Sequence, residues 1–311
     1  MSTVAEEAAT VVFGRYEDVA AALAHPDLVP LPAAAGAVGG VAGLRAAVAR
    51  FSAGEAHRAR RALVEADLAG LDPAALRASA AAGVEPDARL RVVRALAQGL
   101  GLAEPDAVAR AVAVVARAYF TGTPQDAEAD AAVDWLLPRM GVADGPAEHA
   151  ANRIGLLVQA CDATAALVAH ARRAGGEEAA GGAAGASPDV ADVADVLDRT
   201  LHQDPPVAVM RRVAVHDAVV GGTAVAAGTQ VLLDIAAAQQ AAPGRPPLTF
   251  GAPPRLCPGR THALALAAGI LSAPATGPVG GSAVGPVAPV AVGPVPPAAA
   301  ASATRTEEGA A

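Results

Sequence analysis

The sequence LTFGAPPRLCPG, residues 248–259, decides how the rest of the chain is interpreted. Its glycines and prolines predict a loop that lifts Cys257 out of regular structure, and the apolar residues 261–271 predict a helix that opens at Gly259. A sulfur at a helix N-terminus is favoured as thiolate by the partial positive charge of the first backbone N–H groups, and Arg255 adds a cation beside it. A thiolate held in this way is a suitable soft ligand for iron. The alternative is a structural cysteine in a turn.

This loop resembles the heme-binding signature of the cytochrome P-450 family, F-x-x-G-x-x-x-C-x-G. Phe250, Cys257 and Gly259 match the signature, whereas Pro253 stands at the position of its internal glycine. The resemblance implies that Cys257 binds the iron of heme b, iron protoporphyrin IX. It also implies that Phe250, Arg255 and Gly259 belong to the cofactor-binding site.

The composition excludes several classes of protein. The 311 residues carry a net charge of −8, which argues against general nucleic-acid binding, since that needs a basic surface. The first ten residues contain neither a basic segment nor an apolar one, so we expect no signal peptide. We also expect no membrane span, because no segment has ~20 uninterrupted apolar residues. Two cysteines, Cys161 and Cys257, are too few for a tetrahedral zinc site. We therefore expect a cytoplasmic protein.

Residues 51–64, FSAGEAHRARRALV, predict a helix on which His57 and Arg61 share one face. A ring donor beside a guanidinium suits a pair of carboxylates, such as heme propionates. The pair resembles the family's H-x-x-x-R motif, and Arg212 is implied as a further propionate partner by the family-like segment that begins at Arg211. The alternative is a solvated basic helix, on which Arg58 and Arg60 are expected to point elsewhere and to be exposed.

Residues 148–173 form the longest helical pattern, and this segment resembles the family's distal helix with its A-G-x-[D/E]-T motif. Ala160 and Thr164 match, whereas Cys161 replaces the glycine and Ala163 replaces the acid. The resemblance implies that the Thr164 hydroxyl serves oxygen activation by hydrogen bonding to dioxygen. Asp162 is about 100° around the helix from the acid position, so it does not simply substitute for it. The alternative for Thr164 is a core threonine bonded to its own helix.

The largest departure from the family lies at its E-x-x-R motif. Alignment on the D-P-P-V sequence, residues 204–207, places Arg199 at the position of the glutamate and His202 at that of the arginine. The family's buried ion pair is therefore expected to be absent. The pairs Asp195–Arg199 and Asp198–His202 have i,i+4 spacing and offer a partial compensation.

The remaining segments predict a mainly helical fold. We expect a strand at 11–13, a helix at 15–23, a Pro/Gly/Ala loop at 28–43, further helices at 90–102, 106–120 and 127–137, and a small antiparallel sheet within 211–234. The fold class is mainly α with a small β region, resembling an N-terminally truncated cytochrome P-450 fold over residues 11–271. Residues 175–187 predict a flexible low-complexity linker within it, and residues 272–311 a disordered Ala/Gly/Pro-rich tail.

The resemblance implies a heme-thiolate monooxygenase, an oxidoreductase that hydroxylates a small organic substrate with O2, as in secondary metabolism. Electrons would come from NAD(P)H through a reductase and an acidic ferredoxin. A basic surface for the ferredoxin would be formed by Arg58, Arg60, Arg255 and Arg260. Two alternatives stay open. The lost E-x-x-R pair favours a degenerate, non-catalytic scaffold or activator protein, and the missing distal acid favours a peroxide-driven heme enzyme.

Overall fold

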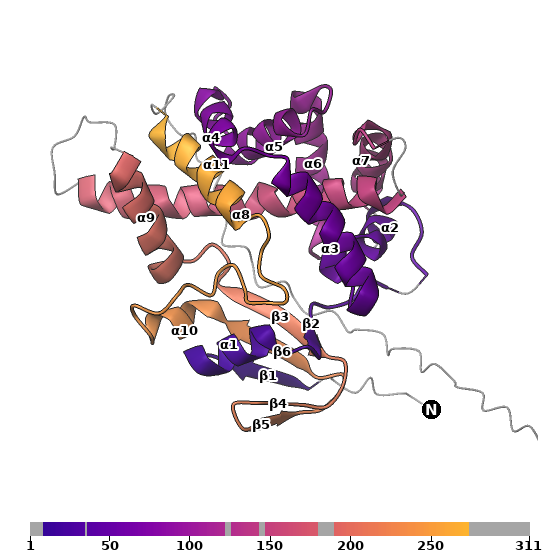
Figure 1. Ribbon diagram of the computed structural model, residues 1–311, viewed down its shortest axis with the longest axis vertical. Coiled ribbons are helices and arrows are strands. Elements are labelled where there is room, and N and C mark those ends of the chain that lie inside the picture. The colour runs from indigo at the N-terminus through magenta and orange to yellow at the C-terminus, as the bar shows by residue number, and fades with distance from the viewer. Residues whose placement is uncertain (1–8, 35, 122–125, 143–146, 180–189, 274–311) are drawn as a thin grey trace, which may run out of the picture.

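A 33-residue helix, α8 (Ala147–Ala179), runs through the helical part of the molecule (Figure 1). The computed structural model describes residues 9–34, 36–121, 126–142, 147–179 and 190–273. Ile154, Leu157, Val158 and Cys161 recur along α8 at three- and four-residue spacing, and each is 0% exposed. Such spacing places them on one face, which is covered by neighbouring helices. The distal helix predicted from the sequence is therefore a core helix.

The other helices of this part surround α8, and α3, α5, α6, α9 and α11 all pack against it. Their bounds are α2 (Gly40–Ala47), η1 (Ala49–Phe51), α3 (Gly54–Ala69), α4 (Pro73–Ala82), α5 (Ala88–Gly99), α6 (Pro105–Tyr119), α7 (Ala127–Leu136), η2 (Leu137–Arg139), α9 (Val190–Gln203) and α11 (Arg260–Ser272). Several begin at an aspartate whose carboxylate accepts a hydrogen bond from a backbone N–H of the first turn, namely Asp72, Asp87 and Asp126.

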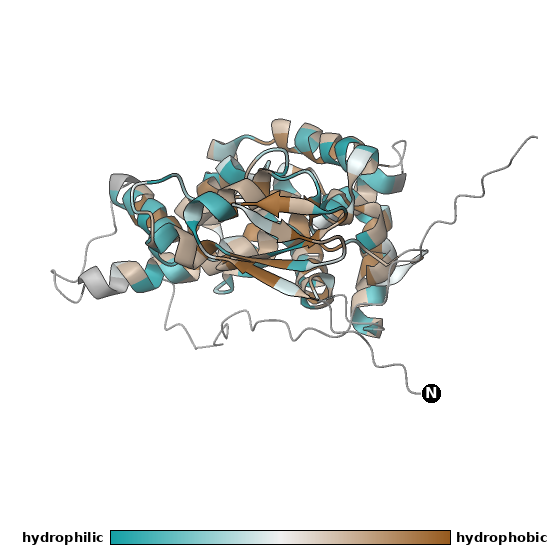
Figure 2. Ribbon diagram, turned by 90° about the horizontal axis from the view of Figure 1, so that it is seen from below, coloured by the Kyte–Doolittle hydropathy of each residue, from teal (hydrophilic) through white to brown (hydrophobic). Residues whose placement is uncertain are grey.

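A smaller part of the molecule is built on a sheet with strand order β1-β6-β3-β2. Its strands are β1 (Thr10–Phe13), β2 (Leu28–Val29), β3 (Val209–Ala214) and β6 (Gln230–Asp234). β3 pairs with β6 antiparallel, as predicted, whereas β1 joins β6 in parallel. The helices α1 (Tyr16–Ala24) and α10 (Ile235–Gln240) belong to this part and contribute to its separate apolar core (Figure 2). A second sheet, β4 (Ala218–Val220) with β5 (Thr223–Val225), is a hairpin whose turn has positive φ at Gly221 and Gly222.

The fold class, mainly α with a small β region, is confirmed. Three local expectations differ from the structure. The segment 28–43 is not a continuous loop, because β2 and the start of α2 lie within it. Helix α4 was not predicted, although Asp72 followed by Pro73 is a helix-start signal. The helix α8 continues to Ala179, past the predicted start of the linker at Gly175, and the rest of the predicted linker up to the start of α9, like residues 274–311 of the predicted tail, lies outside the described residues.

Among the described residues, the segment 148–175 of α8 is the one helix long and apolar enough to cross a membrane by length and composition, with a mean hydropathy of 1.5. In the structure 61% of that window is buried within the protein. The central helix of a globular core has this composition because it is apolar on more than one face.

Gly269→Ala is expected to destabilise the fold by about 1–3 kcal/mol, the usual cost of overpacking a core. Gly269 lies where α11 crosses α4, and a Cβ atom there would overlap the Arg77 carbonyl oxygen and lie 3.2 Å from the Ala80 Cβ. The gain in helix propensity, up to ~1 kcal/mol, does not offset a clash with backbone. Chemical denaturation measures the effect. Gly175→Ala on α8, where a Cβ meets no atom within 4 Å, is the control and should not lower stability.

Candidate functional site

The loop between α10 and α11 carries Cys257 and folds back on itself. The Cys257 N–H donates to the Phe250 carbonyl oxygen at 2.8 Å, and the Gly251 N–H donates to the Leu248 carbonyl oxygen at 2.8 Å. Gly251 has φ +74°, a left-handed conformation that glycine adopts without steric cost. Gly259 caps α11, and its backbone N–H donates a hydrogen bond to the Cys257 sulfur. The sequence thus places the sulfur at a helix N-terminus, as predicted.

The thiol of Cys257 is not favoured as thiolate in the protein without a ligand. Burial raises its pKa above the ordinary value, and this outweighs the lowering by the Gly259 N–H and by the cations of Arg61, Arg50 and Arg260. The predicted effect of the helix end is present, since the Gly259 N–H lowers the pKa of Cys257, but desolvation is the larger effect, and the cations that lower this pKa are those of Arg61, Arg50 and Arg260. A cation that binds the sulfur would displace its proton.

His57 and Arg61 lie on α3 beside this loop. The Arg61 Nη2 atom donates to the Leu256 carbonyl oxygen at 2.7 Å, and its Nε donates to Glu65 at 2.7 Å. The Arg61 side chain is only 21% exposed, so this face is not the solvated basic helix of the alternative interpretation. Burial, Arg255 and Arg61 lower the pKa of His57 to about 4, so the ring is neutral at pH 7 and can donate one hydrogen bond.

Arg212 and Arg255 reach the same place from other segments. The Arg255 Nη2 atom donates to the Ser52 carbonyl oxygen at 2.8 Å, and burial together with Arg61 lowers the pKa of Arg255. Burial, then Arg50 and Arg255, lower the pKa of Arg212 to about 10. The Nε atom of Arg212 is buried without a hydrogen-bond partner in the described structure. A buried guanidinium N–H without a partner indicates a missing acceptor.

Arg50, the middle residue of η1, belongs to this group and was missed in the sequence. Loss of hydration around the guanidinium lowers the pKa of Arg50 overall, with Tyr119 and Cys257 acting in the opposite direction, although the residue as a whole is exposed. The guanidinium lies 5.8 Å from the Phe51 ring centroid and 5.1 Å from that of Phe120. The turn that carries it is held by Asn152 of α8, whose Oδ1 accepts from the Ala49 N–H at 2.9 Å. In the sequence Arg50 directly precedes the segment that contains the His57 helix, but this position alone does not bring it to the cysteine loop.

The donor set fits a dianionic, iron-containing ring. Within the described residues no three His, Cys, Asp or Glu side chains converge as a metal site. Arg50, Arg212 and Arg255 have no carboxylate partner in the part of the chain that the structure describes. Heme b, the cofactor that the sequence resemblance implies, would offer two propionates to these cations and an iron to the Cys257 sulfur. Phe250 lies on the same loop, half-buried, with the Arg260 guanidinium 5.4 Å from its ring centroid.

Thr164 lies on α8 and is 3% exposed. Its hydroxyl has no hydrogen-bond partner among the described residues, so the alternative of a threonine bonded to its own helix finds no support. Nor do the described contacts join it to Cys257. Cys161, 0% exposed, has a raised pKa because of burial and Asp162, and Arg89 is the nearby cation for both residues. Asp162 thus lies near Arg89, at the start of α5.

Neither position of the family's E-x-x-R pair is buried in the structure. Arg199 is exposed, and the His202 side chain is 27% exposed. His202 Nδ1 lies 3.5 Å from the carboxylate of Asp198, which confirms that predicted pair, while the Asp195–Arg199 pair stays a prediction. The two ring nitrogens of His202 also lie near the Asp198 and Arg245 carbonyl oxygens, at 2.7 and 3.2 Å.

Arg60 departs from the expectation that it is exposed. Its side chain is 14% exposed and bonds to Glu148 at 2.6 Å, to the Ala46 carbonyl oxygen at 2.8 Å and to the Ser52 hydroxyl. It therefore holds α3 against α8 and the η1 turn, and it is not part of a basic surface. Arg58 and Arg260 are exposed, as that surface requires.

His57→Gln is expected to reduce the loss of stability on acidification between pH 6.5 and 4. The pKa of His57 falls from 6.5 to about 4 on folding, so between these values the unfolded chain binds more protons and stability rises with pH. The loss of folding stability caused by the lowered pKa of His57 is absent above pH 6.5 and complete below pH 4. Melting temperatures of the heme-free protein across this window should show a shallower slope in the variant. Equal slopes of melting temperature against pH in the variant and in the unchanged chain would contradict the lowered pKa of His57.

Solved structures with this arrangement of elements are cytochromes P-450. P450BioI, solved in complex with hexadec-9Z-enoic acid ligated acyl carrier protein, is 14% identical with a TM-score of 0.67 over 84% of this chain and 83% of that chain. Cytochrome P-450 TxtC is 17% identical, with a TM-score of 0.59 over 84% and 83%. CYP164A2 of Mycobacterium smegmatis, solved in the ligand free state, is 20% identical, with a TM-score of 0.56 over 85% and 82%.

Comparison with protein-family models and with curated proteins gives no match. The likeness is thus carried by the arrangement of elements and not by overall sequence identity. Together with the cysteine loop at the start of α11, it shows that this chain has the fold of the cytochrome P-450 family.

Proposed function

We propose that the chain binds heme b through Cys257 and is a heme-thiolate monooxygenase that hydroxylates a small organic substrate with O2. The observation that carries the proposal is the group of cations gathered around the cysteine loop. Arg50, Arg212 and Arg255 have no carboxylate partner among the described residues, and the Nε atom of Arg212 is buried without an acceptor. Cations held together in this way repel one another, which favours a dianionic ligand among them.

Each residue then has a defined task. The Cys257 sulfur is the iron ligand, and the Gly259 N–H bonded to it stabilises negative charge on the sulfur. Arg50, Arg61, Arg212 and Arg255 pair with the propionates, and the neutral His57 ring donates a hydrogen bond to them. Phe250 holds the ligand loop through its carbonyl oxygen, which accepts the Cys257 N–H. A thiolate-bound heme supplies electron density that favours O–O cleavage.

Thr164 is the residue that we assign to dioxygen. It is buried on α8, and its hydroxyl is not engaged by another described group, so it can donate a hydrogen bond to a ligand. The next residue toward the N-terminus is Ala163, which cannot pass protons to it. Proton delivery through Thr164 therefore relies on water.

The electron supply follows from the same proposal: NAD(P)H, through a reductase and a ferredoxin, in the cytoplasm. Arg58 and Arg260 are exposed on the segments that carry His57 and Cys257, and they offer positive charge to an acidic ferredoxin. Arg60 is excluded from this surface by its bonds to Glu148 and Ser52. A role in secondary metabolism is consistent with the small-molecule chemistry proposed.

The test is the absorption spectrum of the protein purified with heme supplied, reduced, and exposed to carbon monoxide. A strongly red-shifted Soret band shows heme with a thiolate ligand. Turnover with a ferredoxin and its reductase would then establish the monooxygenase reaction. A folded protein, by circular dichroism, that takes up no heme would overturn the proposal.

Two observations favour other functions. The exposed Arg199 and the half-buried His202, at the positions of the family's buried pair, favour a non-catalytic scaffold, which would be folded and free of heme. Ala163 in place of the distal acid favours a heme enzyme that uses peroxide. Turnover with peroxide and none with ferredoxin would establish the second alternative.

A further inference from the structure

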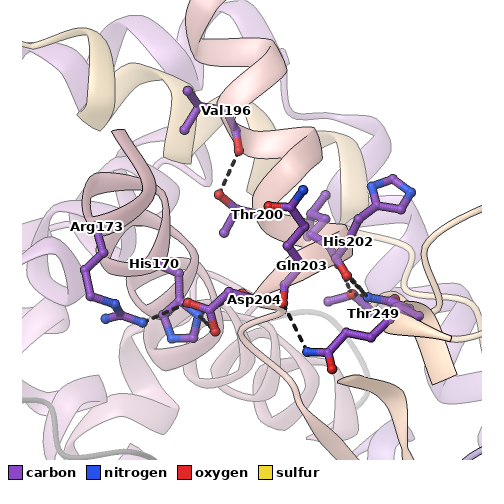
Figure 3. A network of polar contacts seen from close by, with 11 residues as sticks. His170, Arg173, Val196, Thr200, His202, Gln203, Asp204 and Thr249 are labelled. Carbon is purple, nitrogen blue, oxygen red and sulfur yellow. Dashed lines mark hydrogen bonds and ion pairs between the residues drawn. The ribbon is translucent and has the colours of Figure 1, made fainter. Parts of the chain in front are cut away.

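The C-terminal end of α9 and the loop that carries Cys257 are joined by hydrogen bonds between uncharged groups (Figure 3). Gln239 of α10, 4% exposed, lies at the centre. Its Nε2 donates to the Leu201 carbonyl oxygen at 2.6 Å, and its Oε1 accepts from the Leu248 N–H at 2.7 Å. The Thr249 hydroxyl, 6% exposed as a residue, lies 3.2 Å from both the Leu201 carbonyl oxygen and Gln239 Oε1.

These contacts complete a helix end. The last four carbonyl groups of an α-helix have no partner within it, and those of α9 include Leu201 and His202. Gln239 reaches both, at 2.6 and 3.4 Å. The Gln239 Nε2 atom therefore donates toward α9, whereas its Oε1 atom accepts from the cysteine loop.

The hydrogen bonds of the Leu248 N–H and the Thr249 hydroxyl fix the position at which the cysteine loop begins. The next residue, Phe250, offers the carbonyl oxygen that accepts the Cys257 N–H at 2.8 Å. The preceding segment is held as well, because the Tyr16 hydroxyl donates to the Pro246 carbonyl oxygen at 2.8 Å. A shift of Thr249 would thus be passed to the backbone of Cys257 through a single residue.

We propose that Gln239 and Thr249 are positioning residues, forming an uncharged brace that holds the Cys257 loop against α9. The brace stands beside the turn of α9 where Arg199 is exposed and His202 is half-buried. Its purpose, to hold an iron ligand, rests on the proposed function, but its existence does not. Because no charge is involved, salt does not weaken it.

The first test uses the heme-free full chain and iodoacetamide, with alkylation of each cysteine followed by peptide mass spectrometry. Cys257 is half-buried and reports on the loop, whereas Cys161, 0% exposed on α8, reports on global opening. Gln239→Leu is expected to raise the rate at Cys257 about tenfold, since a buried group loses its partners, and to leave Cys161 unchanged. Gln240→Leu is the matched control, because the neighbouring Gln240 is exposed and its amide lies 3.5 Å from the Gln203 carbonyl oxygen.

A conservative pair at Thr249 sharpens this test. Thr249→Val keeps the shape and removes the hydroxyl, so Cys257 should react faster, while Thr249→Ser restores the hydroxyl and should restore the slow rate. The slow rate of the unchanged chain should be the same at low and high salt. Equal rates in Gln239→Leu and Gln240→Leu, or a parallel rise at Cys161, would overturn the brace.

The second readout is spectroscopic and separates this inference from the proposed function. In the heme-loaded, reduced, carbon monoxide-bound protein, Gln239→Leu should lower the share of the red-shifted band and Gln240→Leu should not. If the chain takes up no heme, the alkylation test can still be carried out on it. That outcome would contradict the proposed function only and would leave the brace to be tested. A normal spectrum in Gln239→Leu with unchanged alkylation would reject the brace and leave the function standing.

Discussion

Cys257→Ala is expected to abolish the red-shifted Soret band of the reduced, carbon monoxide-bound protein. The chain has two cysteines, and Cys161 cannot take over the role. Cys161 is 0% exposed within the core face of α8, and burial together with Asp162 raises its pKa far above the usual range. Any heme that remains in the variant would have no thiolate ligand, and its band would lie at shorter wavelength.

Cys161→Ala is the control for that measurement and should keep the band. Both variants remove one thiol, but only Cys257 has the Gly259 N–H and the cations of Arg61, Arg50 and Arg260 around its sulfur. A red-shifted band that survives in Cys257→Ala would assign the ligand elsewhere. Loss of the band in a folded Cys161→Ala protein would also argue against Cys257 as the iron ligand.

Asp67→Ala is expected to lower the free energy of unfolding by about 3–5 kcal/mol, the usual cost of breaking a buried ion pair from one side. The Asp67 side chain of α3 is 6% exposed. It accepts hydrogen bonds from Arg153 at 2.7 Å and from His149 at 3.0 Å, both on α8. Without the carboxylate, the Arg153 guanidinium, 15% exposed, keeps only the Met140 carbonyl oxygen as a partner among the described residues.

Glu65→Ala on the same helix is the comparison. Glu65 is 50% exposed and pairs with Arg61 at 2.7 Å, and an exposed pair of this kind is worth at most about 1 kcal/mol. Urea denaturation followed by circular dichroism gives both values. If Asp67→Ala costs no more than Glu65→Ala, the ion cluster does not hold α3 to α8, and the placement of His57 and Arg61 must come from other contacts.

The contents of the candidate site could be predicted in part. Glycines and prolines around Cys257 place the sulfur in a loop before a helix by local backbone preference alone, and the i,i+4 spacing of His57 and Arg61 places them on one face. Arg50 could not be predicted in this way, since it meets the cysteine loop across more than two hundred residues. The burial of Arg60 could not be predicted either. An arginine in a basic helix is expected to be exposed, and only the fold brings Glu148 and Ser52 beside it.

The sequence by itself determined the helical periodicities, the cysteine loop and the loss of the E-x-x-R residues, because each depends on neighbours within a few positions. Only the tertiary structure decided how charge and hydrogen bonds are distributed. It raised the pKa of Cys257, because desolvation by packed segments outweighs a nearby helix end. It also brought Gln239 and Thr249 together at the end of α9. Packing brings such groups out of water from distant parts of the chain, and a buried polar group must then find its partner wherever the fold provides one.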